Sequence, residues 1–93
     1  MTIYDQIALK IIKEQELLMG PVAWLQAGKV KGLHVDGTKS AEIESGSDGT
    51  NVVNDLVGRY ESLFGRAGRE MCKEAASALV ADLQPSQVPV SLK

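Results

Sequence analysis

The hexapeptide LFGRAG, Leu63–Gly68, decides how many helices this chain has. It lies inside the longest helix-like part of the sequence, in which apolar residues recur at spacings of three and four. At about 100° per residue, the apolar side chains of residues 53–64 point one way and those of residues 72–83 point about 110° away. One straight helix would need two partners that face in different directions, so a break within LFGRAG is expected.

Two glycines of this stretch favour a corner. Gly65 can adopt a positive φ angle, which ends a helix without the steric cost of a Cβ atom. Gly68 costs about 1 kcal/mol relative to Ala inside a helix, but its missing side chain lets another backbone approach closely. The sequence therefore predicts two helices, 52–64 and 67–83, that meet at a tight corner. A single kinked helix is the alternative.

The N-terminal part of the chain predicts a first helix over residues 3–19. Its apolar residues recur at helical spacing, Thr2 and Asp5 form a weak variant of the capping box, and Gly20 is a stop signal. The segment 21–30, which opens on a proline, predicts a short second helix.

The first predicted helix is apolar over a wide arc. Its apolar side chains spread over about 180°, and Leu9 and Leu17 fall outside even that arc, whereas one buried stripe needs only about 100°. We therefore expect this helix to be covered on two sides.

Residues 33–43 change to the period of a strand, because apolar and polar residues alternate. A five-residue loop, 36–40, pairs Val35 with Ala41 and Leu33 with Ile43, which collects the apolar side chains on one face. A two-residue loop pairs apolar with polar residues instead. We therefore predict a hairpin with the five-residue loop, in which Leu33 and Ile43 face the core and the intervening His34 and Glu42 face solvent.

The predicted fold is mainly α, with four short helices and a small β-hairpin between the second and third. Residues 1–84 form a single helical domain. The last segment, 85–93, contains Pro85 and Pro89 and is expected to be extended or disordered.

Composition excludes several classes of function. The 93 residues include one cysteine, Cys72, and one histidine, His34, so neither an internal disulfide nor a closed zinc site is expected. The net charge of −2 gives no general attraction to nucleic acid or anionic lipid. Because no signal peptide or membrane-spanning run is visible, we expect a cytoplasmic protein without a cofactor.

Two loops approach known ligand-binding patterns without completing them. In residues 32–40, GLHVDGTKS, Thr38 separates the glycine and lysine that a phosphate-binding loop needs side by side. In residues 44–55, a calcium loop would have no ligand at its third place, Gly46, and only Asp55 at its twelfth. We interpret the first segment as a surface turn and the second as a polar loop that caps the next helix.

No catalytic constellation is visible. His34 and Asp36 lie on one side of the predicted strand, but no nucleophile is near them in sequence. Cys72 falls on the apolar stripe of the last helix, where a small buried hydrophobe is expected. The chain is therefore predicted not to be an enzyme.

Three arginines cluster near the LFGRAG corner: Arg59, Arg66 and Arg69. They alternate with glutamates, which is typical of a solvated face laced by ion pairs. A small nucleic-acid-binding regulator that uses this corner is the alternative function, although nucleic acid is not the expected partner.

The leading hypothesis is a non-enzymatic protein-interaction or assembly module that forms a homodimer or binds an unidentified protein. A small core without disulfide or metal gains from burial against a partner. Small residues on the last helix allow close approach of another helix, and tryptophan is enriched at the centres of interfaces. The predicted interface residues are Leu9, Leu17, Trp24, Ala75 and Leu79.

Overall fold

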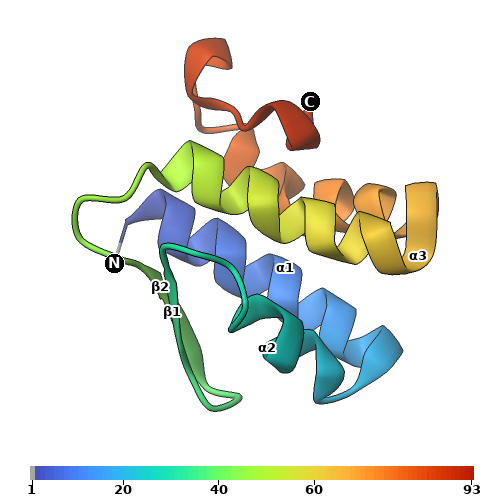
Figure 1. The fold of residues 1–93 in the computed structure, drawn as a ribbon. Coiled ribbons are helices and arrows are strands. Elements are labelled where there is room, and N and C mark those ends of the chain that lie inside the picture. Colours follow the sequence, from blue (N-terminus) through green and yellow to red (C-terminus); the bar gives the residue numbers. More distant parts are fainter. Residues whose placement is uncertain (1) are drawn as a thin grey trace.

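Within residues 2–93, which the computed structural model describes, the chain forms three α-helices and one two-stranded hairpin (Figure 1). The prediction of a mainly helical fold with a hairpin between the second and third helices is confirmed. The elements are α1 (Ile3–Met19), α2 (Val22–Ala27), β1 (Leu33–Asp36), β2 (Ser40–Ile43), α3 (Gly49–Val80) and the 3-10 turns η1 (Pro85–Gln87) and η2 (Val90–Leu92).

Helix α1 is the central element of the fold and has the predicted bounds. The Thr2 hydroxyl accepts from the Asp5 amide at 3.2 Å, and the Asp5 carboxylate accepts from the Thr2 amide at 2.8 Å, which completes the expected capping box. Gly20 ends the helix with φ 64°. Because α3, α2 and β2 all pack against α1, its wide apolar arc is largely covered within one chain.

Helix α3 changes direction at the stretch that the sequence singled out. Gly65 has φ 61° and ψ −145°, so helical geometry stops there and resumes beyond it. The predicted positive φ is confirmed. The predicted corner between the helical segments 52–64 and 67–83 is confirmed as well; because both segments carry the single label α3, the helices number three here rather than the predicted four. Figure 1 shows the second half of α3 running back behind the first.

The bounds of α2 and the start of α3 differ from the predicted bounds by a few residues. The Asp48 carboxylate accepts hydrogen bonds from the backbone at Thr50 and Asn51, so α3 begins at Gly49, three residues earlier than expected. Helix α2 covers only Val22–Ala27 of the predicted 21–30. The Asp48 cap therefore starts α3 earlier than predicted, and α2, which lies between Gly20 and Gly28, is shorter than predicted.

The hairpin has the predicted register. Leu33 pairs with Ile43 and Val35 pairs with Ala41, although the strands also include residues 36 and 40. Leu33 is buried and Ile43 is half-buried against the core, while His34 and Glu42 are exposed. The Asp5 carboxylate accepts from the Ile43 amide at 2.6 Å and so fixes the hairpin to the start of α1.

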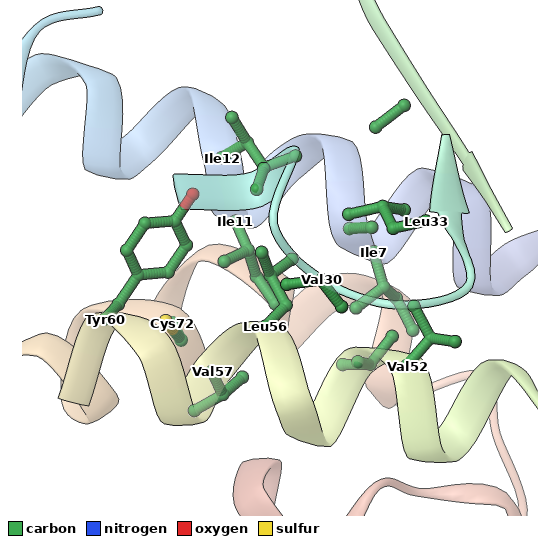
Figure 2. Close-up of a cluster of buried hydrophobic side chains, with 14 of the residues drawn as sticks. Ile7, Ile11, Ile12, Val30, Leu33, Val52, Leu56, Val57, Tyr60 and Cys72 are labelled. Carbon is green, nitrogen blue, oxygen red and sulfur yellow. The ribbon is translucent and has the colours of Figure 1, made fainter. Parts of the chain in front are cut away.

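The core lies between α1 and α3 and is capped by α2 and the hairpin. Figure 2 shows aliphatic side chains from both helices facing one another, with the ring of Tyr60 at one side. Its largest fully buried members include Ile7, Ile11, Ile12, Val53, Leu56, Val57 and Tyr60. Aliphatic residues thus supply most of this core, in keeping with an aromatic content of only 4%.

The C-terminal segment differs from the expectation of an extended or disordered tail. Residues 85–93 form two 3-10 turns, and Pro89 and Leu92 are buried. The Asn54 side chain accepts hydrogen bonds from the Ser91 amide at 3.1 Å and the Ser91 hydroxyl at 2.7 Å. Proline excludes an α-helix here but permits a tight turn. The segment packs mainly against α3, and the Tyr4 hydroxyl of α1 donates to the Gln87 carbonyl at 2.7 Å (Figure 1).

Candidate interaction surface

Two reversals of the chain meet at one end of the molecule. The first is the Gly20 turn between α1 and α2, and the second is the corner at Gly65. The Tyr60 hydroxyl donates to the Ala23 carbonyl at 2.7 Å. The Gln15 side-chain amide of α1 donates to the Gly68 carbonyl, just after the corner in α3, at 3.1 Å. These two hydrogen bonds link the elements that form the two reversals. Both reversals lie at the end of the molecule opposite the hairpin (Figure 1).

Large apolar side chains are exposed at both reversals. Leu17 is 82% exposed and Leu25 is 65% exposed, although leucine is among the residues most often buried in proteins. The remaining four are about half exposed. We refer to these six residues as the apolar end: Leu17, Leu18, Val22, Leu25, Leu63 and Phe64.

Two of the predicted interface residues share a groove that borders the apolar end. Leu9 and Leu17 line a shallow depression of about 470 Å³ on the outer side of α1, together with lysines and glutamates of the same helix. Ala75 lines a second depression of about 270 Å³, and Glu14 contributes to both. The structure therefore places Leu9, Leu17 and Ala75 around one side of α1.

The other two predicted interface residues belong to the interior of the chain. Trp24 is only 3% exposed, and its indole nitrogen donates to the Glu16 carboxylate at 2.8 Å. Leu79 is partly buried against the core. Trp24 therefore presents little free surface to a partner, because its own chain covers its apolar ring and its N–H already has an acceptor.

The three arginines near the corner do not act together. Arg59 donates from Nε to the Gln26 carbonyl at 3.1 Å, which directs it toward α2. Arg69 donates from Nε to the Ser91 carbonyl at 3.2 Å, which directs it toward the C-terminal turns. Only Arg66 is exposed. The geometry therefore does not favour this corner as a single phosphate-binding face.

The residues considered for catalysis are placed apart. Cys72 is fully buried, and burial raises the pKa of its thiol to about 11, in spite of the opposing hydrogen bond from Gln15 at 3.4 Å. His34 is exposed on the hairpin. A protonated thiol without access to solvent is a poor nucleophile, so the geometry offers no cysteine–histidine site.

Among residues 2–93, no three side chains of His, Cys, Asp or Glu lie close enough together to hold a metal ion. None of the helices in the same range is both long enough and apolar enough to cross a bilayer.

Sequence reasoning missed most of the apolar end. Val22 and Leu25 lie three residues apart in the predicted second helix, and Leu63 and Phe64 belong to the apolar set of residues 53–64. Their periodicity is that of buried residues, but α2 turns its two residues away from the core and α3 extends past its partners. The sequence did contain one sign of their exposure, because Gly20 and Gly65 mark chain reversals, and residues next to a reversal lie at an end of the fold.

The apolar end and the two depressions beside α1 are thus the candidate surface for contact with another protein. Comparisons with protein-family models, with curated proteins and with solved structures find no match to this chain.

Proposed function

We propose that the protein is a non-enzymatic interaction module that forms a homodimer through its apolar end. One observation carries this proposal: six large apolar side chains are exposed at two chain reversals that the hydrogen bonds of Tyr60 and Gln15 hold at one end of the molecule. Single exposed apolar residues are ordinary on protein surfaces, whereas a gathered set marks an interaction site.

A second copy of the chain suits this surface. Two-fold symmetry sets the same patch of each protomer against itself, so an apolar patch meets an apolar patch. Full burial of one exposed leucine contributes about 2 kcal/mol, and a stable interface covers roughly 800 Å² on each partner. The apolar end with its bordering groove at Leu9 and Leu17 supplies the apolar centre of such an interface, and the lysines and glutamates of α1 supply a polar rim.

Other elements of the same chain cover most of the wide apolar arc of α1. Leu17 and Leu25 remain uncovered, and they supply the apolar surface for a second copy. We also place the protein in the cytoplasm, since its only cysteine is a buried free thiol, which suits a reducing compartment.

Sedimentation equilibrium over a range of micromolar concentrations tests the proposal. The wild-type chain is expected to show a species of twice its 10.0 kDa mass. Leu17→Asp and Leu25→Asp are expected to shift the population to the monomer, because each would place a carboxylate in the apolar centre.

Val90→Asp is the matched control. Val90 is 65% exposed, as Leu25 is, but it lies in η2, which packs against α3 and is not part of the apolar end. Its substitution is expected to leave the dimer intact. A wild-type mass of 10.0 kDa at every concentration, or equal disruption by Val90→Asp and Leu25→Asp, would overturn the proposal.

A further inference from the structure

A groove with an excess of positive charge lies between the α2–β1 connection and the first half of α3. It has a volume of about 390 Å³, within the range of small-molecule sites. Three cationic side chains line it, Lys29, Lys31 and Arg59, against the single carboxylate of Asp55. The chain as a whole carries a net charge of −2, so this local excess is not a general property of its surface.

Arg59 is fixed in the wall of this groove. Its Nε donates to the Gln26 carbonyl at 3.1 Å, and its side chain is partly buried. This bond uses one edge of the guanidinium and leaves the two terminal nitrogens for an anion. Because an arginine already held in place loses less conformational entropy on binding, it favours recognition of a phosphate oxygen.

The two lysines are carried by an ordered loop. Val30, between them, is 5% exposed and packs in the core. The amides of Lys29 and Val30 donate to the carbonyls of Gln26 and Ala27, each at 3.1 Å. The buried valine therefore fixes the backbone from which Lys29 and Lys31 extend along the groove.

Gly58 lines the same groove, and the fold does not require a glycine there. A Cβ atom at this position would have nothing within 4 Å, whereas Gly32, Gly49 and Gly68 each have a neighbour that a Cβ would meet at 2.9 Å or less. A glycine inside a helix costs about 1 kcal/mol relative to alanine. The open backbone at Gly58 allows a ligand to approach the helix between the cationic side chains.

We propose that this groove binds the phosphate group of a small molecule. The terminal nitrogens of Arg59 contact the phosphate oxygens, the ammonium groups of Lys29 and Lys31 neutralise its charge, and Gly58 leaves room for it against α3. The inference does not depend on dimerisation, because Leu17 and Leu25 do not line the groove.

Titration of the ¹⁵N-labelled protein with sodium pyrophosphate, followed by amide chemical shifts, tests the proposal. Saturable shifts are expected in residues 29–31 and 54–62. Sodium chloride at equal ionic strength is expected to produce none of them. A parallel titration with adenosine diphosphate distinguishes the sources: tighter binding than pyrophosphate assigns a nucleotide, and equal binding assigns a phosphate group alone.

Four variants separate binding from folding. Arg59→Gln and Lys31→Gln are each expected to weaken pyrophosphate binding about tenfold. Lys31→Gln covers the case in which Arg59→Gln also harms the fold, since the Lys31 side chain is exposed. Gly58→Ala is expected to raise the melting temperature and yet weaken binding, and Asp55→Asn is expected to strengthen binding.

Two results would overturn the proposal. One is a set of shifts that fails to saturate or that chloride reproduces, which would mean general screening of surface charge. The other is unchanged affinity in both Lys31→Gln and Arg59→Gln, which would place the anion elsewhere.

Discussion

Gly68 lies against the backbone of Tyr60: a Cβ atom at position 68 would come within 2.7 Å of the Tyr60 carbonyl oxygen. The two halves of α3 therefore touch backbone to backbone next to the corner. Only a residue without a side chain permits this contact, so LFGRAG contains one glycine for the turn and another for the close approach.

Replacement of Gly68 by alanine is expected to lower the free energy of unfolding by about 1–3 kcal/mol, because a backbone atom cannot move aside as a flexible side chain can. Gly58→Ala is the matched substitution in the same helix, where a Cβ meets nothing, and is expected to raise stability by up to about 1 kcal/mol. Urea denaturation of the two variants measures the difference. Equal effects of the two substitutions would contradict the close contact.

Gln15→Met is expected to leave stability unchanged or to raise it by about 1 kcal/mol, because a buried polar atom without a partner is costly. Gln15 is fully buried, and its Oε1 atom has no hydrogen-bond partner, although its Nε2 atom has two. Methionine keeps a similar volume without that oxygen. Calorimetric melting compares the variants, and a loss of several degrees would show that the Nε2 bonds outweigh the orphan oxygen.

Stability is expected to fall as pH rises from about 9 to 11. Burial raises the pKa of the Cys72 thiol from 9.0 to about 11, so within this window the folded chain holds a proton that the unfolded chain has released. The Cys72 contribution, about 2 kcal/mol, is fully present below pH 9 and is lost as pH passes 11. Burial also raises the pKa of Tyr60, which acts in the same direction.

The check is urea denaturation at several alkaline pH values for the wild type and Cys72→Ala. The alanine variant is expected to start from a lower stability and to lose less of it between pH 9 and 11. The same loss in both proteins would exclude Cys72 as the titrating group.

Asp5→Asn is expected to cost about 1–2 kcal/mol at neutral pH, because Asp5 both caps α1 and holds Ile43 of the hairpin. Burial alone would raise the pKa of this carboxyl, but hydrogen bonds from Ile43 and Thr2 bring it below its usual value. The stabilisation is therefore present above the ordinary aspartate pKa and is lost as pH falls through the lower folded value. Denaturation at pH 7 and at pH 2.5 tests this, since the difference between the two proteins is expected to narrow in acid.

Local chemistry allowed the sequence to predict several elements of the fold. Thr2 and Asp5 satisfy the first amides of α1, Gly65 can take a positive φ without the strain of a Cβ atom, and pairing of Leu33 with Ile43 follows from a period of two. Each of these depends on residues that are close in sequence. Such constraints act whatever the rest of the chain does.

The features that the sequence did not reveal depend on contacts between segments that are far apart along the chain. Burial of Trp24 depends on Glu16 and the core beside α2, and burial of Leu92 depends on the side of α3. The basic groove joins a loop at Lys31 to a helix at Arg59. No periodicity reports which separate segments meet, so neither the apolar end nor this groove was predictable before the elements were assembled.

The central position of α1 has a consequence for how the protein is made. The α3 partners of Gln15 follow it by 53 and 57 residues, so α1 leaves the ribosome long before the helix that covers it. Throughout that interval Ile7 and Ile11, fully buried in the finished fold, have no α3 to pack against. The nascent chain thus exposes the apolar face of α1 to the solvent and to other proteins. Packing of α1 against the second half of α3 can begin only after the residues beyond Gly65 have been synthesised.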